Sequence, residues 1–254
     1  MKETAKEVKK KILKMVYDSQ CSHVGSALSC ADILTVLYFK ILSIDLKKPD
    51  RDRFILSKGH ACTALYAVLA EKGFFPKEIL DTYCKDGSKL FGHSTINSLP
   101  GIEASAGSLG HGLPIGAGMA LAGNRIFVLM GDGECDEGSV WEAALFASHH
   151  KLDKLTAIID YNKIQAFGET NKVLNLEPLK DKWVSFGWSV KEIDGHNLDE
   201  IEETLKNVPF EKDKPSLIIA HTIKGKGVSF MENQLAWHYK SPTKEQYEQA
   251  LKEL

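Results

Sequence analysis

Two polar residues, Asp132 and Asn162, each follow an apolar segment of the chain, and their side chains suit a divalent cation. Asp132 lies between two glycines in Gly131-Asp132-Gly133, behind the apolar run 126–130, and Asn162 comes shortly after the run 156–159. A carboxylate and an amide oxygen are ligands for Mg²⁺ or Ca²⁺, and Mg²⁺ commonly shares its coordination shell with phosphate groups. Glycine allows the backbone to come close to a phosphate. The pattern predicts a site for a divalent cation and a diphosphate.

The elements around these residues explain how the two side chains could meet. The runs 126–130 and 156–159 predict buried strands, and residues 139–149 predict the helix after the first of them. Both polar residues then lie at the carboxyl ends of strands, where open α/β sheets bind ligands, and the start of the helix offers N–H groups to an anion. A simple tight turn would explain Gly-Asp-Gly by itself. It would not explain the second strand with Asn162.

The rest of the chain alternates predicted strands with predicted helices. The opening segment has Ile12, Met15 and Val16 at helical spacing, and Ser29 to Asp32 has the pattern of a capping box for a helix running to about residue 42. The remaining predicted elements are a strand at 53–56, a helix at 59–71, strands at 188–193 and 216–220, a helix at 198–205 between them, and a helical tail from 240. This alternation predicts an α/β fold, with a doubly wound, mostly parallel sheet flanked by helices. No repeat or linker is visible, so residues 1–254 are expected to form a single domain.

Histidines are frequent, and several lie in loops beside glycine. The five in such contexts or near them are His23, His60, His93, His111 and His238. Each by itself is more typical of an ordinary hydrogen-bonded histidine, and their spacing contains no zinc motif such as His-Glu-x-x-His. An imidazole also suits proton transfer near neutral pH. Both interpretations stay open at this level.

Composition excludes several classes of partner. The 254 residues carry 32 Lys+Arg and 34 Asp+Glu, a net charge of −2, so no general attraction to nucleic acid or anionic lipid is expected. The five cysteines form no Cys-x-x-Cys pair, which argues against a disulfide framework and a zinc site. No apolar run approaches ~20 residues, and the N-terminus lacks a signal-peptide core. A cytoplasmic protein without a membrane or nucleic-acid partner is therefore expected.

Several long motifs resemble one family. Gly131-Asp132-Gly133, followed after 28 residues by Asn162, is similar to the diphosphate motif of thiamine-diphosphate enzymes. The longer segments resemble transketolases, and they are FILSKGHACTALY (54–66), LPGIEASAGSLGHGLPIGAGMALA (99–122) and GDGECDEGSVWEAALFASHHKLDKLTAIIDYNKIQ (131–165). The resemblance therefore covers most of the chain, with the motifs in the family's order.

The resemblance implies a fold and a set of ligands. The fold would be the diphosphate-binding domain of the thiamine-diphosphate-binding fold. Mg²⁺, or Ca²⁺ or Mn²⁺ in its place, would be held by Asp132, by the side chain of Asn162 and by the backbone carbonyl of Ile164. The residues implied in thiamine diphosphate binding are His60, Gly107, Ser108, Leu109, Asp132, Gly133, Glu137, Asn162 and His238. Ser108 stands where many relatives have proline, and His111 where other transketolases have glutamine.

The resemblance also implies an activity. Transketolases transfer a two-carbon ketol unit from a ketose donor, often a sugar phosphate, to an aldose acceptor. The histidines that match those lining the family's substrate channel are His23, His60, His93 and His238. Two departures flank that channel, SHVG around His23 and Tyr239 after His238, and they predict a donor or acceptor outside the central pentose-phosphate set. Two other interpretations remain, namely a decarboxylase or synthase type of thiamine enzyme and a non-catalytic cofactor-binding subunit.

A partner chain is implied as well. A complete transketolase is more than twice as long, and the glutamate that activates the cofactor belongs to its second domain. The chain is thus similar to the N-terminal subunit of a split transketolase, with the activating and C-terminal domains on a separate chain. A two-plus-two heterotetramer is expected, in which Glu137 and Glu142 match carboxylates at the subunit interface.

Overall fold

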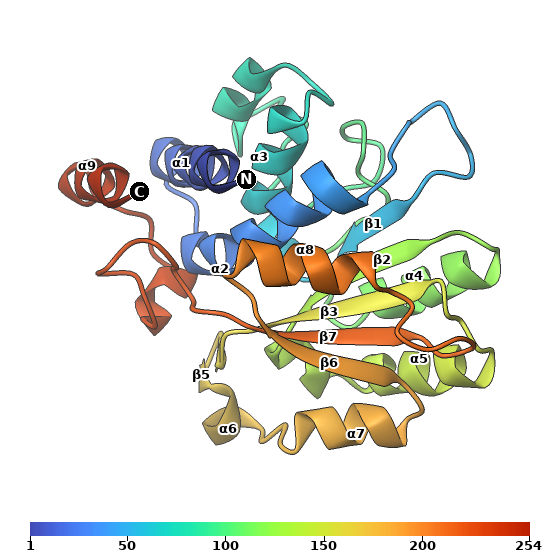
Figure 1. Ribbon diagram of the computed structural model, residues 1–254. Coiled ribbons are helices and arrows are strands. Elements are labelled where there is room, and N and C mark those ends of the chain that lie inside the picture. The colour runs from blue at the N-terminus through green and yellow to red at the C-terminus, as the bar shows by residue number, and fades with distance from the viewer.

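A parallel sheet forms the middle layer of the computed structural model, which describes residues 1–254 (Figure 1). Its five strands are arranged in the order β1-β2-β3-β7-β6, and all neighbouring strands are parallel. The strands are β1 (Arg53–Leu56), β2 (Ile126–Gly131), β3 (Leu155–Tyr161), β6 (Ser189–Asp194) and β7 (Ser216–His221). The predicted doubly wound α/β class is confirmed.

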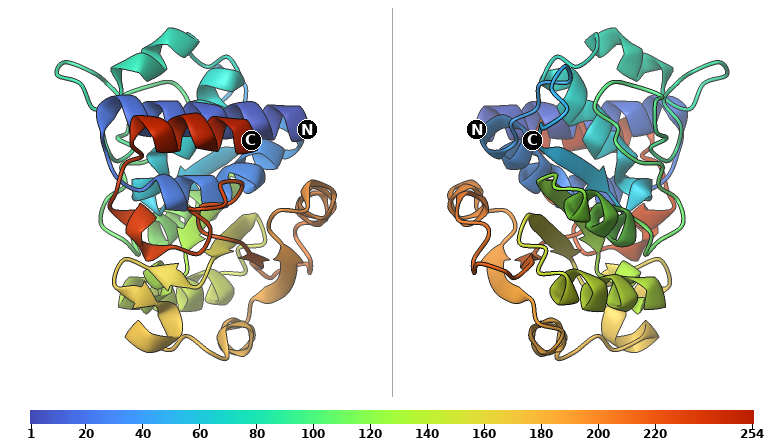
Figure 2. Two further views of the ribbon diagram at one scale, coloured as in Figure 1. Left: turned by 90° about the vertical axis from the view of Figure 1, so that its left-hand side faces the viewer. Right: turned by 90° about the vertical axis from the view of Figure 1, so that its right-hand side faces the viewer.

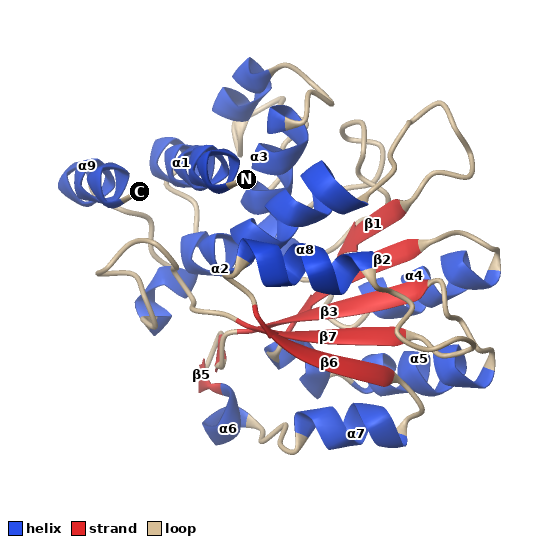
Figure 3. Ribbon diagram, viewed as in Figure 1, coloured by secondary structure: helices blue, strands red, loops and turns tan.

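Helices cover both faces of this sheet (Figure 3). One face packs against α2 (Val24–Val36), α3 (Cys62–Glu71) and α8 (Leu198–Lys206), and α1 (Lys2–Ser19) packs on the outside of α2 and α3. The other face packs against α4 (Gly112–Leu121), α5 (Gly138–His149) and α7 (Leu179–Ser185). The last helix, α9 (Lys244–Glu253), lies beside α1, so the two ends of the chain are close together (Figure 2). A small hairpin of β4 (Ile164–Gln165) and β5 (Gly168–Glu169) and a short helix α6 (Thr170–Val173) follow β3.

Alternation along the strands divides the interior into two hydrophobic cores. On β2, Phe127 and Leu129 contribute to the core beneath α1, α2, α3 and α8. Val128 and Met130 contribute to the core beneath α4, α5 and α7. Because successive side chains of a strand point to opposite faces, a strand that is apolar at every position can serve both cores. This explains why the central strands are continuous apolar runs.

The predicted elements agree with the structure except at α2. The expected capping box at Ser29 to Asp32 is wrong, because α2 begins at Val24 and both residues lie buried within it. The hydroxyl of Ser29 donates to Asp160 at 2.6 Å, and Asp32 pairs with Lys9 at 2.9 Å. These polar residues therefore make tertiary contacts from the middle of a buried helix.

The segment Val24–Ile41 is long and apolar enough to cross a membrane, contrary to the expectation that no apolar run approaches that length. It comprises α2 and the π-helical turn Leu37–Ile41 that continues it. However, 83% of this segment is buried inside the protein. Packing in the core between α1, α3 and α8 accounts for its composition.

Candidate active site

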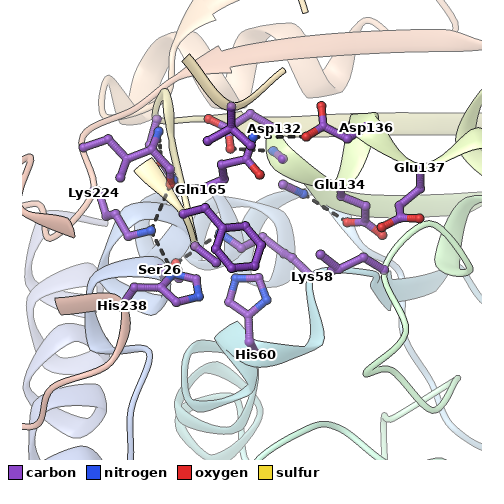
Figure 4. A pocket seen from close by; sticks show the side chains of 18 residues that line it. Ser26, Lys58, His60, Asp132, Glu134, Asp136, Glu137, Gln165, Lys224 and His238 are labelled. Atoms are coloured by element: carbon purple, nitrogen blue, oxygen red, sulfur yellow. Dashed lines mark hydrogen bonds between the residues drawn. The ribbon is translucent and has the colours of Figure 1, made fainter. Parts of the chain in front are cut away.

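A cleft of about 290 Å³ opens at the carboxyl ends of the central strands (Figure 4). Its lining comes from segments far apart in the sequence, including residues that follow β1, β2, β3 and β7. In Figure 4 the acidic residues after β2 lie at one end of the cleft, and the imidazoles of His60 and His238 lie at the other. The sheet therefore brings a group of acidic residues and two histidines into one hollow.

Asp132 lies at the acidic end directly after β2. Its side chain is buried, and its two carboxylate oxygens accept the backbone N–H groups of Gly133 at 2.7 Å and Lys163 at 2.5 Å. It forms no salt bridge. Burial, together with the nearby charge of Asp160, raises the pKa of Asp132 to about 6. A buried carboxylate that forms no ion pair favours the arrival of a cation.

The other two predicted cation ligands lie on the next loop. The amide of Asn162 donates to Ser29 at 3.2 Å, and its oxygen accepts the N–H of Ile164 at 3.1 Å. The carbonyl of Ile164 accepts from the ammonium of Lys224 at 2.9 Å. Each of these oxygens has a second lone pair. The set combines a carboxylate, an amide oxygen and a backbone carbonyl, which fits Mg²⁺ or Ca²⁺, and no cluster of three or more His, Cys, Asp or Glu ligands exists in the chain.

A short 3₁₀ turn follows Asp132. A 3₁₀ segment, Gly133–Asp136, separates β2 from α5, which begins at Gly138 with Glu137 as its N-cap. The N–H of Gly133 is directed at the side chain of Asp132 rather than into open space. The helix itself begins one residue before its predicted start at 139. The backbone at this turn stays close to the loop after β3, since a Cβ at Gly133 would approach Gln165 at 2.6 Å.

The four histidines predicted together do lie together. The ring centroid of His23 is 5.3 Å from that of His60, 5.0 Å from that of His238 and 6.1 Å from that of His93. The centroids of His60 and His238 are 5.4 Å apart. His111 is exposed and lies outside this cluster, with its ring nitrogen 3.1 Å from the carbonyl of Leu109.

Burial keeps these imidazoles neutral. It lowers the pKa of His23 to about 4, with the charges of His93 and Lys224 adding to the effect. It lowers the pKa of His238 to about 3, with Lys224 and His23 adding to the effect. Burial likewise lowers the pKa of His60 and of His93. A neutral imidazole has one donor and one acceptor nitrogen, so the cluster can both give and take hydrogen bonds from hydroxyl groups.

Two buried lysines in the cleft were not predicted from the sequence. Lys58 forms an ion pair with Asp160 and donates to the carbonyl of Ser26 at 3.2 Å. Lys224 donates to Ile164 and lies 2.9 Å from Nδ1 of His238. Burial, with the charge of Lys58, lowers the pKa of Lys224 to about 8. Their positions in the sequence could have indicated them, since Lys58 closely follows β1 and its partner Asp160 interrupts the apolar run of β3.

The predicted loop at Gly107 to Leu109 is held beside the turn after β2. The buried carboxylate of Glu134 accepts the N–H groups of Gly110 at 2.8 Å and Gly131 at 3.1 Å. Leu109 lines the cleft, whereas the side chain of Ser108 is exposed. Gly107 has a φ of 150° and lies next to His93. The loop therefore extends from the cleft to His93.

The two predicted interfacial carboxylates face different hollows. Glu137 lines the cleft described above. Glu142 lines a separate groove between α4 and α5, together with Pro114 and Phe146. The structure thus separates the two residues.

Comparison with known proteins places the chain among related sequences. The family model described as transketolase, thiamine diphosphate binding domain, matches residues 2–254. The chain is 46% identical over 255 residues to an apulose-4-phosphate transketolase subunit from Phocaeicola vulgatus, covering 97% of this chain and 90% of that protein. It is 46% identical over 259 residues to the 6-deoxy-6-sulfo-D-fructose transketolase subunit SqwG from Clostridium sp., covering 98% and 94%.

Solved structures agree with these sequence relatives. Transketolase from Campylobacter jejuni superposes with a TM-score of 0.91 at 32% identity, covering 98% of this chain and 42% of that one. A transketolase mutant from Pichia stipitis gives a TM-score of 0.92 at 27% identity, covering 98% and 40%. The chain thus spans about two fifths of these full-length enzymes.

Proposed function

The chain belongs to the transketolase family, in its thiamine diphosphate-binding domain, and we propose that it binds Mg²⁺ and thiamine diphosphate as the N-terminal component of a two-chain transketolase. One observation carries the proposal. The cleft joins a buried carboxylate that forms no ion pair, Asp132, to His60 and His238, two members of a cluster of four neutral histidines. An anionic cofactor with its cation fits the first end, and a polyhydroxylated substrate fits the second.

Residues at the acidic end would hold the cation and the diphosphate. Asp132, the side chain of Asn162 and the carbonyl of Ile164 would coordinate Mg²⁺. Lys224 would add positive charge toward the phosphates, because its ammonium already lies at Ile164. Leu109, from the loop that Glu134 ties to the turn after β2, would pack against the cofactor's rings.

The histidine end would handle the sugar. When bound, thiamine diphosphate supplies the electron sink that allows a carbon–carbon bond beside a ketone to break. His23, His60, His93 and His238 would donate hydrogen bonds to sugar hydroxyls, accept from them and carry protons between them. Their lowered pKa values leave each ring neutral at physiological pH, with one nitrogen that donates a hydrogen bond and one that accepts. The proposed reaction is transfer of a two-carbon ketol unit from a ketose to an aldose.

A second chain would complete the site. Relatives of similar length are named as transketolase subunits, while this chain spans about two fifths of full-length transketolases. The activating glutamate and the remaining domains would come from a separate C-terminal chain, in a two-plus-two assembly. Phe167 at the tip of the β4–β5 hairpin lines the cleft and is 81% exposed, which leaves an apolar surface for that chain to cover.

Binding and turnover test the two parts of the proposal separately. Calorimetric titration of the chain, alone and mixed with its C-terminal partner, is expected to give thiamine diphosphate binding that depends on Mg²⁺. Asp132→Ala should weaken this binding by about 100-fold or more, since it removes a direct ligand. Asp153→Ala, just before the amino end of β3 and outside the cleft, is the matched control and should bind like the wild type.

Ketol transfer should occur only in the mixture of the two chains. Transfer by the purified chain alone would contradict the two-chain arrangement. Binding without transfer, for every ketose donor offered to the mixture, would instead support a non-catalytic cofactor-binding role.

A further inference from the structure

A buried chain of hydrogen bonds lies behind the cleft, centred on His196. This residue occupies the loop between β6 and α8, and it does not line the cleft. Its Nδ1 is 2.8 Å from the carboxylate of Asp32 on α2, which also binds the ammonium of Lys9 at 2.9 Å. Its Nε2 accepts the backbone N–H of Ile223 at 2.9 Å. The imidazole thus connects a helix on one side to the segment after β7 on the other.

The donors and acceptors in this row of hydrogen bonds are fixed. Burial would raise the pKa of Asp32, but the hydrogen bond from His196 and the charge of Lys9 outweigh it and hold the pKa low. An ionised carboxylate only accepts hydrogen bonds, so Nδ1 of His196 carries the proton. The lone pair of Nε2 is then directed at the N–H of Ile223. With side-chain exposures of 11% for His196 and 7% for Asp32, water competes little for these bonds.

The residue after Ile223 is Lys224, whose ammonium lies inside the cleft between the carbonyl of Ile164 and Nδ1 of His238. Two backbone bonds also hold this segment, from Gly225 to Gly25 at 2.9 Å and from Asn233 to Lys224 at 2.9 Å. Both hold the backbone after Ile223, on the side away from β7. On the β7 side, the N–H of Thr222 donates to the carbonyl of Tyr161 at 3.2 Å and its hydroxyl donates to Asp160. At Ile223 itself, the bond to His196 is the side-chain contact that holds the backbone N–H.

We infer that His196 is a positioning residue of the active site. By accepting the N–H of Ile223, it sets the backbone from which Lys224 reaches Ile164 and His238. Asp32 and Lys9 in turn hold the imidazole in the tautomer that can accept. The inference rests on the proposed function only for its consequence in cofactor binding, because the position of Lys224 can be measured without cofactor.

Two substitutions, each of which keeps one of the two hydrogen bonds of the imidazole, test the two contacts separately. The amide of asparagine overlaps the Nδ1 position, so His196→Asn keeps a donor for Asp32 and removes the acceptor for Ile223. The amide of glutamine reaches the Nε2 position, so His196→Gln keeps an acceptor for Ile223 and removes the donor for Asp32. Each variant loses one buried hydrogen bond of comparable strength. A similar loss of thermal stability is therefore expected in both, whereas only His196→Asn frees Ile223.

The first measurement is the acylation rate of Lys224 in the full chain, followed by mass spectrometry. His196→Asn should raise this rate by about tenfold, a factor that corresponds to one net hydrogen bond, while His196→Gln stays near the wild type. The exposed His149→Asn is the control and should leave the rate unchanged. Equal rates in the two His196 variants, or rates that follow the melting temperature alone, would overturn the inference.

The second measurement is the affinity for thiamine diphosphate with Mg²⁺. It should fall by about tenfold in His196→Asn and by less than about threefold in His196→Gln. If the wild type itself binds no thiamine diphosphate, the proposed function fails while the acylation result still decides the role of His196.

If the asparagine variant does not fold, amide hydrogen exchange in the wild type tests the contact instead. The N–H of Ile223 must then exchange as slowly as those of β7, and exchange at the rate of exposed loops would refute the contact.

Discussion

The carboxylate of Asp132 illustrates how a single residue links stability to binding. Its pKa is about 6 in the folded chain, raised mainly by burial and by the charge of Asp160, against 3.8 for an ordinary aspartate. Because the folded pKa is the higher one, the ionised form destabilises the cation-free fold. This penalty is absent below the unfolded pKa and grows as the pH rises, until it is complete above about 6. A bound Mg²⁺ would remove it.

The raised pKa of Asp132 predicts how Mg²⁺ binding and stability depend on pH. Proton and Mg²⁺ compete for Asp132, so the affinity of the chain for Mg²⁺ should be constant above about pH 7 and fall by about tenfold for each pH unit below 6. Asp132→Asn should stabilise the cation-free chain at pH 8 by about 1–2 kcal/mol and abolish Mg²⁺ binding. Urea unfolding and Mg²⁺ titration between pH 5 and 8 measure the two effects. Equal stability of variant and wild type at pH 8 would show that the buried charge is compensated.

The ion pair between Lys58 and Asp160 provides a second test at the same scale. Asp160 is fully buried, and beyond Lys58 it accepts only from neutral groups such as Ser29. Lys58→Met should therefore destabilise the fold by about 3–5 kcal/mol, since it leaves a buried carboxylate without its cation. Adding Asp160→Asn should recover most of that loss, as measured by urea unfolding of the double variant. Additive losses in the double variant would argue against a coupled pair.

The same residues show what could be predicted from the sequence about the site. Asp132 and Asn162 follow recognisable strands, and the four histidines match family motifs, so their proximity could be anticipated. Lys58 and Lys224 could not, because a lysine beside glycine is ordinarily a solvated loop residue. Only the tertiary structure shows that both ammonium groups are buried, and that Asp160 and His238 receive them.

At the scale of elements, strands were easier to predict than the start of α2. Continuous apolar runs between turns define β1, β2, β3 and β7 almost to the residue. Helix α2 is buried on all sides, so it has no polar face from which a helical period could be recognised. Its N-cap is His23, which has a φ of 75° and no capping side-chain bond. A polar Ser29 within the helix then resembled a cap, although its partner is Asp160 on the sheet.

The side chain of Tyr239 is one of the contacts that hold the β4–β5 hairpin. The hydroxyl of Tyr239 donates to the carbonyl of Ala166 at 2.8 Å, which ties the segment of His238 to the loop that follows the cation ligands. Tyr239→Phe removes this bond alone. We expect faster amide exchange across residues 164–169 by about three- to tenfold, with unchanged global stability, because the bond is exposed and local. Unchanged exchange in this hairpin would show that packing, not the hydroxyl, holds it.

At the scale of the whole molecule, the groove between α4 and α5 is a candidate interface with the C-terminal chain. It contains Glu142 and Phe146, and the same two helices carry the exposed side chains of Ile115 and Leu145. If this surface forms the interface expected for Glu142, then Leu145→Asp should abolish association with the C-terminal chain and leave the fold of this chain unchanged. Light scattering measures the association, and circular dichroism measures the fold. The exposed Val184→Asp on α7 is the control, and equal effects of both changes would place the interface elsewhere.

The order of the sheet has a consequence for synthesis of the chain on the ribosome. Strand β7 lies between β3 and β6, although it is the last of the five to be translated. Until residues 216–221 have left the exit tunnel, β3 presents an open edge and β6 has no neighbour in the sheet. Unpaired edges of this kind attract other strands. The nascent chain should therefore need protection by chaperones up to that point, and then complete its sheet in a single late step.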